Sequence, residues 1–182
     1  ANFTLQEELV ERQYWLIRLR WIAVAGVNLV VLSASRLFQF SLPVFPLYAI
    51  AICLAVYNLI FLFLLSRLQK ESFIAINRIA NSQIALDLLS LASLIHFSGG
   101  IENPFIFYFI FHMIIASILL SRRAAFLQAT FTVFLLCLVA ILEYYRVLPH
   151  YPLKGFVFYN QYSNLLYIYG TLFVFITTLY IA

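Results

Sequence analysis

Charged residues are scarce in this chain. Asp, Glu, Lys and Arg together make up 10% of its 182 residues, whereas they make up roughly 25% of an average soluble domain. Hydrophobic residues account for 65%, and the mean hydropathy is +0.99. This composition excludes an ordinary soluble globular protein. The net charge of +4 gives no indication of nucleic-acid binding, and its distribution along the chain bears on membrane topology instead.

Cysteine is nearly absent as well. Cys53 and Cys137 each fall in an apolar stretch, which argues against a disulfide framework and against a thiolate metal site. No second His, Cys or acid stands at ligand spacing beside His112, so we expect neither haem nor zinc. The sequence also has no phosphate-binding glycine loop, no nucleophile arrangement and no repeat of known period. We therefore predict no catalytic residues, no metal and no covalent cofactor in this chain.

Long apolar runs dominate what is present, and a bilayer-spanning helix needs about 20 mostly apolar residues. We predict an all-α integral membrane protein, with a cytoplasmic amphipathic lead-in at 1–17 and a transmembrane domain at 18–182. The segment at 67–79 is expected to form a short helix on the inner membrane surface. Six transmembrane helices are predicted, at about 18–38, 44–65, 82–97, 104–120, 124–143 and 163–182.

The basic residues favour one orientation. With the N-terminus inside, eight of them lie on the cytoplasmic side and three outside, which agrees with the positive-inside rule. Both termini are then cytoplasmic, and we expect a cytoplasmic continuation after Ala182. The eight are Arg12, Arg18, Arg20, Arg67, Lys70, Arg78, Arg122 and Arg123, and the three are Arg36, Arg146 and Lys154.

A short polar break separates the third and fourth predicted helices, from Ser98 to Phe105. Gly99 or Gly100 can adopt the left-handed conformation that closes a helix, Asn103 is a good N-cap, and Pro104 suits the first helical turn. One interpretation is a tight helical hairpin without chemistry. The other is a ligand site at the edge of the bilayer, in which His96, Phe105 and Tyr108 join the turn.

Polar residues also occur inside the predicted spans. Gln83, Asp87 and Ser90 are spaced to form one stripe on the third helix, and a carboxylate at this depth costs a few kcal/mol unless it is paired, protonated or hydrated. His112 lies at a similar depth on the fourth helix. We therefore expect a buried network of Gln83, Asp87, Ser90 and His112. Asp87 is either a structural carboxyl or a proton carrier.

The segment between the last two predicted helices, 144–162, is rich in tyrosine. We expect it to be an interfacial loop on the outer face, where it can also cover a ligand site at the turn. Just before it, Glu143 stands three residues from Arg146. This spacing predicts a local ion pair at the surface.

Together these residues resemble a known membrane domain. The motif Gly99-Gly100-Ile101-Glu102-Asn103-Pro104-Phe105, with Gln83 and Asp87 before it and Leu119-Leu120-Ser121-Arg122-Arg123 one helix later, resembles RegB/PrrB-type redox-sensing histidine kinases. More loosely, the chain is similar to the six-span input domains of PilS-like and NtrB-like sensor kinases. The RegB resemblance implies ubiquinone sensing, with Asn103 and Phe105 as quinone contacts and the glycines shaping the turn. The redox-active cytoplasmic cysteine of that family has no counterpart here.

The resemblance implies a transmembrane signal-input domain of a bacterial two-component sensor histidine kinase. The bilayer of the inner membrane, a second copy of the chain and a cognate response regulator are then the expected partners. Phosphotransfer chemistry would belong to a longer parent chain, because the kinase region is absent from residues 1–182. The alternative is a small quinone- or lipid-binding structural subunit of an energy-transducing membrane complex. A transporter is disfavoured, since one intramembrane acid and no inverted repeat give it little basis.

Overall fold

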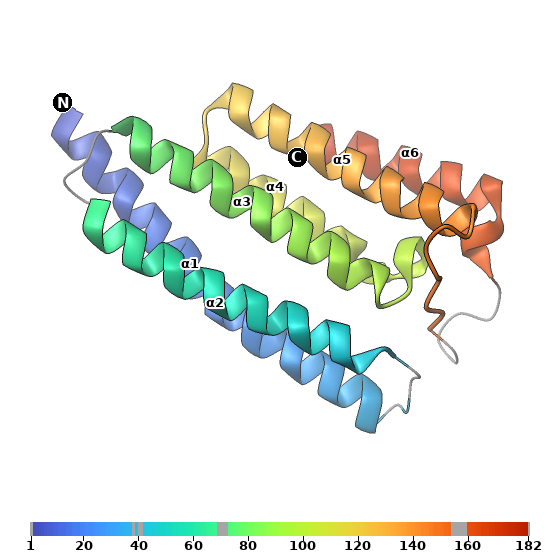
Figure 1. Cartoon of the computed structure of the whole chain (residues 1–182). Helices are drawn as coiled ribbons and strands as arrows, with labels where there is room; N and C mark the ends of the chain where they lie inside the picture. Colours follow the sequence, from blue (N-terminus) through green and yellow to red (C-terminus); the bar gives the residue numbers. More distant parts are fainter. Residues whose placement is uncertain (1, 38, 40–41, 69–72, 154–159, 182) are drawn as a thin grey trace.

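The computed structural model describes residues 2–37, 39, 42–68, 73–153 and 160–181. In this part of the chain the regular structure is helical, which confirms the predicted all-α class with six α-helices. Short 3₁₀ helices, η1 (Gly100–Glu102) and η2 (Pro104–Phe107), precede the fourth α-helix, and η3 (Gln161–Ser163) precedes the sixth. The six are α1 (Asn2–Arg36), α2 (Val44–Leu68), α3 (Phe73–His96), α4 (Tyr108–Leu119), α5 (Arg122–Tyr144) and α6 (Leu165–Ile181) (Figure 1).

Four of these helices are long and apolar enough to cross a membrane: α1 from Glu8 onward, α2, α3 and α5. The apolar stretch Pro104–Leu119 and α6 are shorter, at 10–17 residues. The predicted lead-in continues into the first span as one helix, which begins at Asn2. The expected separate helix at 67–79 is wrong, because α3 already begins at Phe73 and no Gly or Pro interrupts it before His96. Residues 69–72 and 154–159 lie outside the described residues.

Helix α3 is the centre of the bundle. It contacts α1, α2, α4 and α5, with the α1–α2 pair on one side of it and α4 to α6 on the other (Figure 1). Its buried residues, among them Ile84, Leu88 and Ile95, join residues of α4, α5 and α6 in the main core. We call the end of the bundle that carries residues 98–105 the turn end, and the opposite end, where α5 starts at Arg122, the basic end.

Side-chain hydrogen bonds mark where η2 leads into α4, where α4 ends and where α5 begins. Asn103 accepts a hydrogen bond from the Phe105 N–H at 2.8 Å, and Pro104 opens the helical turn that leads into α4. At the basic end, Arg12 donates from Nη1 to the Ile118 carbonyl at 2.6 Å, so that α1 satisfies a terminal group of α4. Ser121 then accepts from the Ala124 N–H and starts α5.

A buried ion pair joins α1 to α3. Arg20 and Asp87 are only 3% and 6% exposed. Arg20 donates from Nε to Asp87 Oδ1 at 2.7 Å and from Nη2 to Oδ2 at 2.8 Å, which is the two-pronged geometry that suits a guanidinium and a carboxylate. Arg20 is among the eight basic residues predicted on the cytoplasmic side. The structure corrects this, because the side chain turns into the bundle to neutralise Asp87.

The remaining polar groups around the pair complete its hydrogen bonding. Asn58 on α2 accepts from Arg20 Nη1 at 2.6 Å, and Tyr57 donates to Asp87 Oδ1 at 2.5 Å. Gln83 accepts from Arg20 Nη2 at 3.1 Å. The hydrogen bonds of the pair therefore involve three helices, α1, α2 and α3. A buried ion pair is tolerated when such additional hydrogen bonds satisfy its remaining donors and acceptors.

The predicted polar stripe on α3 therefore faces α1 and α2. Gln83 extends the network by donating to Gln13 at 3.0 Å, and Ser90 lies one turn beyond Asp87, next to Tyr57. His112 does not join them. Its Nδ1 lies 2.9 Å from the carbonyl of Tyr108 on its own helix. The expected link between Asp87 and His112 is replaced by the link to Arg20, because a guanidinium offers a permanent positive charge and two parallel N–H donors to the carboxylate.

Removing either charge from the ion pair should destabilise the bundle strongly. We expect Arg20→Met and Asp87→Leu each to cost about 3–5 kcal/mol, since each leaves one buried charge unpaired. The double variant should lose much less than the sum, because no charge then remains. The measurement is the apparent Tm of the purified protein in detergent. Arg18→Met, at an exposed position on the same helix, is the control. Additive losses would show that the two side chains act independently.

Candidate functional site

The turn between α3 and α4 is built by its two glycines and by Asn103. Gly99 and Gly100 have φ values of 115° and 54°, both in the region that favours glycine. Asn103 is only 2% exposed. Its side-chain nitrogen donates to the carbonyl of Ser98 at 2.7 Å and to its hydroxyl at 2.6 Å, while its oxygen accepts from the Phe105 N–H. All of its amide functions are therefore used inside the turn.

The glycines also let other parts of the chain approach closely. A Cβ on Gly100 would lie 2.2 Å from Glu143 Oε2, and a Cβ on Gly99 would lie 3.0 Å from the side chain of Leu153. Glu143 belongs to the last turn of α5, and Leu153 follows that helix. The turn therefore packs against the end of α5 and against the segment that follows it, residues 145–153.

Glu143 is the central residue of this contact. It is 1% exposed, and its two oxygens face two histidines: Oε1 lies 2.7 Å from His96 Nδ1 and Oε2 lies 2.6 Å from His150 Nδ1. The expected surface ion pair with Arg146 is therefore wrong. Arg146 is exposed, with a positive φ of 57° that turns the chain away from α5, whereas the glycine turn leaves room for the carboxylate inside.

A second carboxylate, that of Glu102, contacts the other ring nitrogen of His150. Glu102 Oε2 lies 3.3 Å from His150 Nε2, and Oε1 accepts from the Tyr162 N–H at 2.8 Å. The His150 ring stacks on the Tyr162 ring, with centroids 3.9 Å apart and an interplanar angle of 15°. We call His96, Glu102, Glu143 and His150 the His–Glu cluster. Its hydrogen bonds connect α3, η1 and α5 to His150 and to η3.

The charge of His150 follows from these partners. Burial disfavours its charged form, but the hydrogen bonds and charges of Glu102 and Glu143 outweigh burial and raise its pKa to about 9. His150 is therefore protonated at neutral pH. The cluster has the residue types of a metal site, yet within the described residues no group of three or more His, Cys, Asp or Glu is arranged to hold a metal ion.

The residues predicted to bind a ligand divide into two sets. His96, Gly99, Gly100 and Asn103 serve the internal contacts of the turn. Pro104, Phe105 and Tyr108 are exposed, and the Phe105 and Tyr108 rings lie 5.6 Å apart on the surface of the bundle. The residues not predicted from the sequence are Glu102 and His150, which bind each other, and His150 also binds Glu143, although Glu102 stands inside the motif itself.

A groove runs beside the turn. Its volume is about 410 Å³, and its walls come from the turn, from η2 and from α6. Glu102 and Asn103 line one side, while Tyr167 and Thr171 line the other. Gly170 lies between these two α6 residues, and a Cβ added there would meet nothing within 4 Å. The groove is therefore lined mainly by apolar groups, with a few polar side chains among them.

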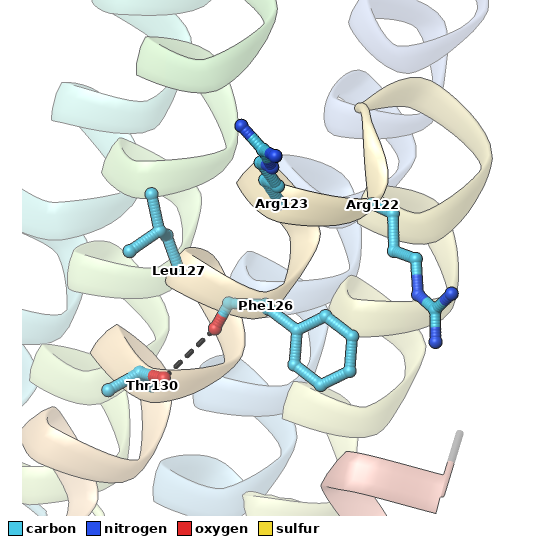
Figure 2. Close-up of a pocket in the computed structure, with 5 residues that line it drawn as sticks. All are labelled: Arg122, Arg123, Phe126, Leu127 and Thr130. Atoms are coloured by element: carbon cyan, nitrogen blue, oxygen red, sulfur yellow. Dashed lines mark hydrogen bonds between the residues drawn. The ribbon is translucent and has the colours of Figure 1, made fainter.

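A second depression, of about 460 Å³, lies at the basic end. Figure 2 shows its lining on the first turns of α5, with the Arg122 and Arg123 guanidinium groups pointing to different sides of Phe126. Thr130 bonds back to the Phe126 carbonyl at 3.0 Å. This depression is an exposed helix face far along α5 from Glu143, so it is separate from the turn.

Gly100→Ala should disrupt the turn. The substitution places a methyl group against a carboxylate that two histidines hold in position, and it forces alanine into a left-handed conformation, so we expect a loss of about 2–3 kcal/mol. Gly170→Ala is the matched control, because open space surrounds that position. The measurement is again the apparent Tm in detergent. Equal Tm values for the two variants would contradict the close packing of Gly100 on Glu143.

Comparison with known proteins identifies the family. A family model described as a PilS-like transmembrane domain matches residues 4–179. No curated protein and no solved structure matches the chain significantly. The match covers all six helices and the turn, so it applies to the domain as a whole. The chain belongs to the family of PilS-like six-helix transmembrane domains.

Proposed function

We propose that the chain is the signal-input domain of a bacterial sensor histidine kinase, with the turn end on the outer face of the inner membrane. The family match over residues 4–179 carries this proposal, because such domains are typical inputs of these kinases. The charges support the orientation. With Arg20 assigned to the bundle interior, seven basic residues remain on the proposed cytoplasmic side, against three outside.

The His–Glu cluster supports a role in signalling, because it joins the elements that would have to move. His96 ends α3, Glu143 ends α5, and Glu102 holds the backbone just before α6. A stimulus that binds one arrangement of these elements better than another shifts the equilibrium between them. In this proposal α6 passes the shift to a kinase region after Ala182. The kinase acts as a homodimer and phosphorylates a cognate response regulator.

Quinone is the ligand that we propose for the turn end, and the nearer likeness to RegB/PrrB-type sensors is part of this proposal. The groove supports it, since a bilayer-soluble ring with a long tail needs an apolar channel and a few polar contacts. The amide hydrogens of Asn103 are already used, so we assign Asn103 to shaping the turn. The hydroxyls of Tyr167 and Thr171, one helical turn apart on the groove wall, are the proposed donors to the quinone carbonyls.

The kinase assignment predicts both a sequence and an activity. We expect a phosphoacceptor histidine segment to follow Ala182 in the gene. The full-length product in lipid nanodiscs should incorporate phosphate from ATP in an acid-labile, base-stable form, as expected for phosphohistidine. A gene product that lacks this segment and this activity would contradict the kinase assignment and favour a structural subunit of a membrane complex.

The quinone assignment predicts a bound cofactor that depends on the groove. Wild-type protein should copurify with quinone at a fixed ratio to protein, and Gly170→Phe should lower that ratio by about tenfold or more, because the ring fills the channel. Gly26→Phe, at an open position on α1, is the matched control. The measurement is solvent extraction and chromatography at equal phospholipid content. Quinone that follows phospholipid equally in all three proteins would contradict the site.

A further inference from the structure

We propose that the His–Glu cluster is a proton-operated latch, in which protonated His150 holds the segment after α5 against the 98–105 turn. Its deprotonation releases that segment. The ligand of this site is a proton, and it binds in addition to any ligand of the groove. This inference rests on the proposed function only in assigning the latch to signal input. The latch itself is argued from the geometry of the cluster.

The hydrogen bonding of His150 requires two ring protons. Its Nδ1 and Nε2 each face a carboxylate oxygen, at 2.6 Å and 3.3 Å, and a carboxylate can only accept. A neutral imidazole has a single N–H. When the proton passes to solvent, one ring nitrogen must therefore present its lone pair to a carboxylate. The contact with Glu143 is the shorter, so the contact with Glu102 is the one that breaks.

The surrounding groups do not replace that proton. The titratable groups that contact His150 are Glu143 from α5, Glu102 from η1 and Tyr162 from η3. His96 from α3 lies beyond Glu143, and the ring of Tyr151, the residue after His150, packs on the His96 ring. His96 can satisfy Glu143 Oε1 with its own Nδ1–H, because the two atoms are 2.7 Å apart. Arg146 is exposed on the same segment and forms no ion pair with the residues that the structure describes.

The direction of the pH effect follows from the raised pKa of His150, about 9. An unperturbed histidine has a pKa of about 6.5. The stabilisation that protonation gives to the closed latch is therefore complete below about pH 6.5 and is lost as the pH rises through 9. The latch is closed in neutral medium and opens in alkaline medium. Its opening frees Leu153 from Gly99 and Glu102 from His150.

A spin label can test the latch directly. A nitroxide at the exposed position Pro149→Cys, in a Cys53→Ala, Cys137→Ala background, reports the mobility of the segment in nanodiscs at room temperature. We expect an immobile spectrum at pH 6.5 that becomes mobile with a midpoint near pH 9. A label at Phe45→Cys, on an exposed site of α2, should not change. A wild-type spectrum that is unchanged from pH 6.5 to about 10.5 would overturn the latch.

Glu102→Gln is the decisive variant. Its amide oxygen can accept from the Tyr162 N–H, as Glu102 does, while its NH₂ donates to the lone pair of neutral His150. We expect this variant to stay immobile at high pH. His150→Gln should be mobile at every pH, and His112→Gln, on α4, should behave as wild type. A Glu102→Gln protein with the wild-type transition would refute the mechanism, even if His150→Gln failed to fold.

The outcomes separate the latch from the proposed function. A pH-dependent label together with a full-length protein that shows no kinase activity contradicts the proposed function and supports the latch. A pH-independent label together with a kinase that responds to quinone contradicts the latch and leaves the proposed function in place. Activity of the full-length protein that changes across the same pH range as the label would connect the two.

Discussion

Burial of the Arg20–Asp87 pair is the constraint on which the arrangement of the helices depends. Apolar helix faces specify one another poorly in lipid, since the tails around them are equally apolar. A charge in the same place is costly until it meets its partner, so Arg20 and Asp87 allow one rotation and one depth for α1 relative to α3. Asn58 and Tyr57 extend that requirement to α2. The α1–α2 pair is thereby fixed to the rest of the bundle.

Helix α3 carries this ion pair and the His–Glu cluster on one rigid element. Asp87 and His96 are nine residues apart, which corresponds to about 14 Å along a helix axis. The first binds α3 to α1 and α2, and the second binds it to α5. A displacement of the turn end would therefore act on α3 and α5 through these contacts. Helix α4 follows the turn through η2, which Asn103 caps, and near its other end the Ile118 carbonyl accepts from Arg12 of α1.

Helices and their caps could be predicted from the sequence, whereas hydrogen-bond partners far apart in the chain could not. The helices followed from apolar runs, and the capping roles of Asn103 and Pro104 followed from residue type alone. Glu143 was assigned to Arg146 because helix rules compare residues three or four positions apart, whereas its partners are His96, 47 residues away, and His150. Which of these residues Glu143 meets depends on how each helix is rotated about its own axis, and the sequence does not give that rotation. The spacing of Gln13 and Arg20, seven residues apart and thus on one face of α1, was the available signal that Arg20 faces inward.

The Arg20–Asp87 pair and the His–Glu cluster differ in whether their cation can lose its proton, and this difference suggests different roles for them. Arginine keeps its proton at every accessible pH, so the cation of the Arg20–Asp87 pair is permanent, and its hydrogen bonds join α1, α2 and α3. The cation of the His–Glu cluster is an imidazolium, which can lose its proton. The movable part of the bundle should therefore lie at the turn end. Glu102 faces both His150 and the groove beside α6, so a ligand in that groove and a proton on His150 act on the same carboxylate. If the proposed ligand and the proposed proton both bind there, their binding free energies are coupled through Glu102.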